Sequence, residues 1–234
     1  MVPTEARRTP LIGLLECSYK LNHSDTKRVT IGVDLVEDCF PFISIGKVGG
    51  LCIKLNYGEW CDLLKCESEV KSYFSGVAIP HKIAFGRYVL KFRTVFGAKS
   101  IVLEVPENSD VKSGVYLARA SWNGIFNIAE CVRLRWNERN EWSTYASKIV
   151  DLKVDSIFNT LKTEVENGEI LDNIPHEIMN RSHFNPDDIG STPKTLNVNA
   201  LIEDICSVLR THDGENFVKK EMLLRDSKIL VQSE

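Results

Sequence analysis

The sequence predicts an α+β fold in which tandem antiparallel β-β-β-α units are followed by C-terminal helices. Short runs in which apolar and polar residues alternate, the period of strands, begin near Lys27. Each group of such runs gives way to apolar residues at helical spacing. The same order then recurs, and the tryptophans that begin the two helical stretches, Trp60 and Trp122, are 62 residues apart.

The first unit is expected over residues 27–78. Alternation around Ile31 predicts one strand, and residues 40–45 and 51–55 predict two more, joined by a tight turn at Gly49-Gly50. From Asn56 the apolar residues follow a helical period, with Asn56 as the N-cap and Gly76 as the end. The pattern therefore predicts three strands and one helix.

The second unit is expected over residues 79–140 and repeats this order. Residues 83–95 predict a long strand, and residues 99–105 and 115–117 predict two shorter ones. Ser121 is a suitable cap for a helix whose apolar face runs from Trp122 to Trp136.

The remaining segments flank the two units. Residues 1–26 are expected to form an N-terminal arm, and residues 141–234 an acidic helical region. Within that region, residues 142–161 and 201–209 carry apolar stripes at helical spacing. From Asp213 the pattern is compatible with a further helix or with a tail.

Charge is distributed unevenly along the 234 residues, whose net charge is −3. Residues 1–150 contain 20 Lys and Arg against 16 Asp and Glu, whereas residues 151–234 contain 9 against 16. Residues 80–140 are the most basic part, with 10 against 5. This asymmetry hints at an anionic partner for the middle of the chain.

Cysteine usage and hydropathy favour an intracellular protein, located in the nucleus or the cytoplasm. The seven cysteines are scattered without paired spacing, which suits a reducing compartment better than a disulfide framework. No apolar run reaches the roughly 18 residues of a membrane helix, and the first residues lack the apolar core of a signal peptide. We expect no membrane association.

Motifs of catalysis and cofactor binding are missing from the sequence. Cys61 and Cys66 have no second cysteine pair, and His176-Glu177 lacks the second histidine of a zinc protease helix. No nucleophile motif or phosphate-binding loop occurs, since the glycines near Gly49 join two strands. We therefore expect a protein that is not an enzyme, without a cofactor or a metal.

The segment 83–95 carries most of the functional signal. Because strand side chains alternate, Phe85, Arg87, Lys91 and Arg93 are expected on one face of one strand. Such a face could hold phosphates and stack bases. The alternative is an edge strand that its charges protect from aggregation. In the first unit Lys54 should also point outward, near Lys47 at the turn.

The sheet-then-helix pattern and the segments 42–47, 50–55 and 59–64 resemble the single-strand-binding superfamily of positive cofactor four, the PUR repeats and the Whirly proteins. The resemblance covers residues 27–140. It implies that two units pair into one module that binds single-stranded DNA or RNA with little sequence preference. The binding residues implied are Lys47, Lys54, Arg87, Lys91 and Arg93, with Phe85 or Tyr116 stacking on bases.

Three departures from that family are visible. The region is only mildly basic, the family's units contain four strands where three are predicted here, and the acidic C-terminal region has no counterpart in the family. A second hypothesis is therefore an assembly or adaptor protein that forms homo-oligomers through its sheet edges and C-terminal helices. An enzyme with an unfamiliar site ranks third.

Overall fold

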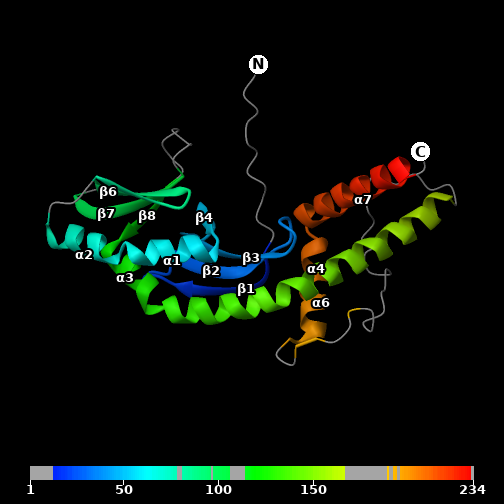
Figure 1. The fold of residues 1–234 in the computed structure, drawn as a ribbon, viewed down its shortest axis with the longest axis horizontal. Coiled ribbons are helices and arrows are strands. Elements are labelled where there is room, and N and C mark those ends of the chain that lie inside the picture. The colour runs from blue at the N-terminus through cyan, green and yellow to red at the C-terminus, as the bar shows by residue number, and fades with distance from the viewer. Residues whose placement is uncertain are drawn as a thin grey trace, which may run out of the picture. The chain divides into compact units, whose positions relative to one another are not determined.

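The computed structural model describes residues 13–77, 81–95, 97–105, 114–166, 189, 192–193 and 196–232. Within them lie two four-stranded antiparallel sheets and six helices, so the fold is α+β (Figure 1). None of the described helices combines the length and the apolar character needed to cross a membrane.

The chain divides into two compact units. One, called here the two-sheet unit, comprises Glu16–Gly32 and Pro41–Arg139. The other, called the helical unit, comprises Met1–Leu15, Val33–Phe40 and Asn140–Glu234. Strands β1, β2 and β3 and helix α4 have residues in both units.

The first sheet has the strand order β1-β2-β3-β4. Its strands are β1 (Gly13–Lys20), β2 (Lys27–Asp34), β3 (Phe40–Lys47) and β4 (Cys52–Leu55). The predicted turn at Gly49-Gly50 is confirmed, with Gly49 at φ 65° and the Lys47 N–H donating to the Leu51 carbonyl at 3.0 Å. Glycine suits this position because other residues rarely adopt a positive φ.

Two short helices follow the first sheet, α1 (Tyr57–Lys65) and α2 (Glu67–Ser75). The predicted cap is confirmed: the Asn56 side chain accepts from the Glu59 N–H at 2.8 Å, and the Glu59 carboxylate accepts from the Asn56 N–H at 2.9 Å. Gly76, at φ 93°, ends α2 as predicted. The single helix expected here is wrong, since Cys66 separates the two.

The second sheet has the order β5-β6-β7-β8. Its strands are β5 (Lys82–Phe85), β6 (Tyr88–Val95), β7 (Ala98–Glu104) and β8 (Val115–Ala118). Helix α3 (Arg119–Asn127) begins directly after β8, so the predicted cap at Ser121 is wrong, and that side chain is buried inside the helix. Helix α4 (Ala129–Glu166) follows, and α6 (Val198–Leu209) and α7 (His212–Gln232) come last.

Three strands per unit were predicted, and each sheet has four. Strand β1 lies in the expected N-terminal arm and was missed because Glu16, Ser18 and Lys20 are exposed and Leu15, at φ 54°, interrupts the alternation. The expected long strand 83–95 is instead the β5–β6 hairpin, in which Phe85 pairs with Tyr88 around Gly86-Arg87. Gly86, at φ 50°, makes this two-residue turn feasible.

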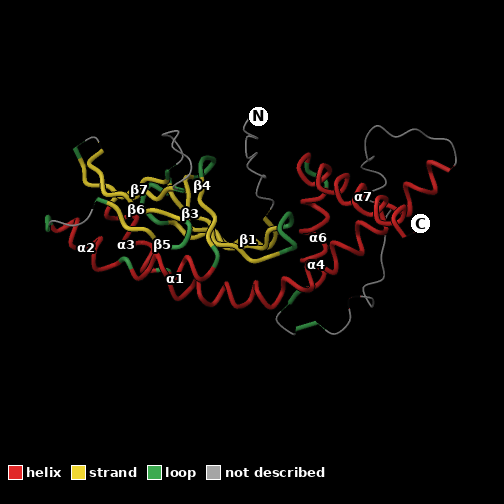
Figure 2. Tube along the Cα trace, turned by 45° about the horizontal axis from the view of Figure 1, so that its top comes forward, coloured by secondary structure: helices red, strands yellow, loops and turns green. Residues whose placement is uncertain are grey.

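One hydrophobic core joins the inner faces of both sheets with helices α1 and α3. Trp60 and Trp122 are each the fourth residue of their helix and are each 1% exposed. They pack with strand residues that include Ile31, Ile45 and Leu90. Figure 2 shows these helices beside the strands. The side chains of the second sheet that point away from this core include Lys91 and Arg93.

The helical unit has a core of its own. Buried residues of α4, among them Ile149 and Ile157, pack with Leu201 and Ile205 of α6 and with Val33 of β2. The predicted apolar stripe over residues 142–161 is therefore confirmed, although it belongs to one continuous helix that begins at Ala129.

The two units differ in net charge more than residues 1–150 and 151–234 do. The two-sheet unit contains 17 Lys and Arg against 11 Asp and Glu, a net charge of +6. The helical unit contains 12 against 21, a net charge of −9. The basic character thus belongs to the unit that holds both sheets.

Candidate nucleic-acid interface

The face of the second sheet that points away from the core carries most of the predicted binding residues. In β6, Tyr88, Leu90 and Phe92 point into the core. Because side chains alternate, Lys91 and Arg93 point the other way. We call this surface the outer β5–β8 face; its residues are Lys82, Ala84, Val89, Lys91, Arg93, Ser100, Val102, Glu104, Tyr116 and Ala118.

Strand register aligns four residues of this face in one row. Lys82 pairs with Lys91, Lys91 with Val102, and Val102 with Tyr116. Three strand spacings of about 4.8 Å make such a row roughly 14 Å long. Lys82 is exposed at one end, and Tyr116 is 40% exposed at the other. Val102, between Lys91 and Tyr116, is only 1% exposed, so positive charge and an aromatic ring are accessible at the two ends of the row.

The Lys82–Lys91 pair is unfavourable for the isolated sheet. Like charges directly opposite each other on neighbouring strands are destabilising by a few tenths of a kcal/mol. Glu104 offsets part of this repulsion: its carboxylate accepts a short hydrogen bond from the Lys91 ammonium and lies 3.9 Å from a guanidinium nitrogen of Arg93. Lys91 is 34% exposed and Arg93 51%, so a polyanion can reach both.

The position of β6 in the sheet argues against edge protection as the role of its cations. Edge protection applies to strands with an open side. Strand β6 lies between β5 and β7 and is hydrogen-bonded on both sides, so Lys91 and Arg93 lie on a central strand. Edge protection accounts only for Lys82, on β5.

Phe85 and Arg87 do not lie on the outer β5–β8 face. The hairpin turns Phe85 into the core, where it is 6% exposed and its ring lies 5.8 Å from that of Tyr88. A buried ring cannot stack on a base, so the prediction for Phe85 is wrong. Arg87 lies in the turn instead of on a strand, 62% exposed.

Arg87 ties the hairpin to the first sheet and its helix. Its Nε lies 3.1 Å from Glu59 Oε1 in α1, and its Nη2 donates to the Lys54 carbonyl at 3.3 Å. The Tyr88 hydroxyl donates to the same carbonyl. The structure thus brings Arg87 to Lys54, in contacts that join the two sheets.

Lys47 and Lys54 belong to the first sheet. Lys54 lies on its outer side, opposite Ser44, with its ammonium 5.9 Å from the centre of the Phe42 ring. Lys47 is exposed at the end of β3. Burial, followed by the charge of the neighbouring Lys47, lowers the pKa of Lys27. Lys27 and Lys47 are therefore close enough to repel each other.

Lys82 is the residue of this surface that sequence reasoning missed. The segment 83–95 was interpreted as one strand, which left Lys82 outside it. The available signal for a hairpin was the pair Gly86-Arg87, which lies between two apolar runs and begins with a glycine. A hairpin would have placed Lys82 opposite Lys91.

No group of three or more potential metal ligands occurs among the described residues. Comparisons of the chain with models of known protein families, with curated proteins and with solved structures give no match.

Proposed function

We propose that the two-sheet unit binds single-stranded nucleic acid, DNA or RNA, on the outer β5–β8 face. Lys82, Lys91 and Arg93 contact phosphates, and Tyr116 stacks on a base. Binding is largely insensitive to sequence, since stacking on an aromatic ring and phosphate contacts are available to every base.

The placement of two cations on a central strand carries this proposal. A central strand has no edge to protect, and the Lys82–Lys91 pair costs stability that Glu104 offsets only in part. A bound phosphate removes that cost by placing negative charge beside both ammonium groups. The exposed Tyr116 on the same row supplies the stacking surface that single-strand binders use.

The resemblance to the family of PUR repeats and Whirly proteins supports the same proposal. That family's units have four strands, the number in each sheet here. In both halves of the two-sheet unit a four-residue strand precedes a nine-residue helix with tryptophan at its fourth position. We infer that the two halves are tandem copies that together form one binding module.

Titration with a fluorescein-labelled oligothymidylate at several salt concentrations tests the function. For single strands the slope of log K against log salt is roughly −0.7 per neutralised phosphate, so three contacts give roughly −2. Lys91→Gln/Arg93→Gln should weaken binding and bring the slope to about −0.7.

A matched control is Lys65→Gln/Lys71→Gln, which removes two charges from α1 and α2 of the same unit. This variant should bind almost as the wild type does. Equal weakening in both variants would show that only net charge matters and would refute the proposed face.

A further inference from the structure

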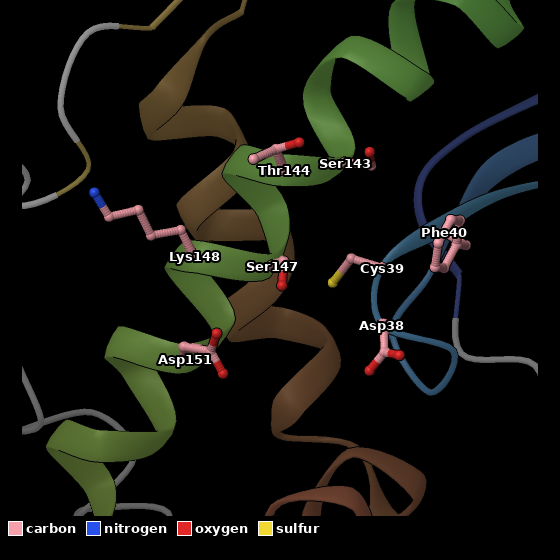
Figure 3. A pocket seen from close by; sticks show the side chains of 8 residues that line it. All are labelled: Asp38, Cys39, Phe40, Ser143, Thr144, Ser147, Lys148 and Asp151. Atoms are coloured by element: carbon pink, nitrogen blue, oxygen red, sulfur yellow. The ribbon is translucent and has the colours of Figure 1, made fainter.

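An open hollow of about 400 Å³ lies within the helical unit, between the β2–β3 loop and helix α4. Figure 3 shows the residues that line it. They are Asp38 and Cys39 from the loop, Phe40 from the start of β3, and Ser143, Thr144, Ser147, Lys148 and Asp151 from α4. The nucleic-acid interface proposed above uses none of them.

The loop is held in a conformation that presents Phe40 to solvent. Asp38 and Cys39 both have positive φ, at 50° and 57°, which is costly for residues other than glycine. Burial of the Cys39 side chain in the core of the helical unit holds this backbone in place. Phe40 is left 64% exposed at the rim of the hollow.

Acceptor groups dominate the walls. Asp38 and Asp151 contribute carboxylates from opposite walls, and Ser147 lies toward the Cys39 sulfur (Figure 3). The one cation of the lining, Lys148, extends away from the loop and donates to the Ile189 carbonyl at 3.0 Å. Among the described residues no cation pairs with Asp38.

Carboxylates act on the Cys39 thiol at the hollow. Burial, followed by the charges of Asp151, Asp34 and Asp38, raises the pKa of Cys39 to about 12. The thiol therefore stays neutral at physiological pH. The unit around these carboxylates carries a net charge of −9.

We propose that this hollow binds the guanidinium group of an arginine in a basic segment of a partner protein. The planar group stacks on the exposed Phe40 ring, and its N–H donors reach Asp38, Asp151 and Ser147. A guanidinium offers five donors in a plane and stacks on aromatic rings, which a lysine ammonium does less well. Because the hollow is open, the side chain enters while its backbone stays outside.

The test is a fluorescence anisotropy titration of the full chain with three labelled nonapeptides of glycine and serine. Their central residue is arginine, lysine or citrulline, the last being an uncharged analogue of arginine. The arginine peptide should bind best, and citrulline should abolish binding. Asp38→Asn/Asp151→Asn should weaken the arginine peptide at least about tenfold, and Phe40→Ala about threefold.

The matched control is Glu141→Gln/Glu203→Gln, which removes two exposed carboxylates of the same unit outside the hollow and should change affinity little. Equal binding of the arginine and citrulline peptides would overturn the proposal without reliance on any variant. Tighter binding of spermidine than of the peptide would overturn it in favour of a free polyamine. Self-association that Asp38→Asn/Asp151→Asn abolishes would overturn it in favour of a second copy.

Discussion

Glu104→Gln should tighten the binding of single-stranded nucleic acid. In the free protein the Glu104 carboxylate pairs with Lys91 and approaches Arg93, the two cations proposed to hold a phosphate. A phosphate bound there must share both cations with a fixed negative charge. Glutamine keeps the size and hydrogen-bonding capacity of the side chain and removes that charge.

Coulomb's law gives the magnitude. A phosphate between Lys91 and Arg93 lies roughly 7 Å from the carboxylate, and an effective dielectric constant of about 20 is typical of charge pairs near a protein surface. The repulsion is then about 2.4 kcal/mol before screening by salt, which sets an upper bound of roughly fiftyfold in affinity. Salt should reduce the gain, because mobile ions screen the interaction.

Anisotropy titration of a labelled oligothymidylate against wild type and Glu104→Gln measures the effect. Glu130→Gln is the control, since Glu130 pairs with Arg133 on helix α4, away from the outer β5–β8 face. It removes the same charge from the same unit and should leave affinity within about twofold of the wild type. Unchanged or weaker binding by Glu104→Gln would refute the proposed phosphate position.

Three further predictions concern stability and reactivity. Gly124→Ala places a Cβ 2.5 Å from a backbone oxygen and should lower the free energy of unfolding by about 1–3 kcal/mol in urea titrations, whereas Gly58→Ala, whose nearest atom is a side-chain oxygen at 3.3 Å, should not. Hydrogen bonds from Arg28 lower the pKa of Asp25 to about 2, below its ordinary 3.8, so its stabilisation exists above about pH 4 and is lost as pH falls toward 2. Melting temperatures of wild type and Asp25→Asn should therefore differ at pH 6 and converge near pH 2; a constant difference would contradict this. With a pKa of about 12, Cys39 should resist iodoacetamide at pH 8 until the chain unfolds, whereas the exposed Cys131 should react at once. Mass spectrometry of the peptides measures both modifications, and equally fast modification of Cys39 in the folded chain would contradict this prediction.

The parts of the fold that were predicted correctly are those in which one face of an element is buried. Ile53 and Leu55 alternate with exposed or half-exposed residues and were placed inward correctly. Asn56 and Gly76 were correct because capping and the left-handed conformation are local properties of these residue types. In these cases tertiary packing agrees with the local signal.

The errors arise where packing overrides a local pattern. Ser121 has the chemistry of a cap, yet strand β8 runs straight into α3 and takes Ser121 inside the helix. The hairpin at Gly86-Arg87 was missed because apolar residues flank it on both sides. A turn reverses which residues share a face, so Phe85 lies in the core with Tyr88. The register of β6, β7 and β8, which the sequence does not show, places Tyr116 on the same face as Lys91.

Photo-cross-linking tests the central claim most directly. An oligonucleotide of thymidine with a single 5-iodouracil, irradiated in complex with the wild-type chain, reacts with an aromatic side chain against which the base stacks. Peptide mapping should place the cross-link at Tyr116, and Tyr116→Leu should abolish it. A cross-link confined to the helical unit, or one that survives in Tyr116→Leu at the same yield, would contradict binding on the outer β5–β8 face.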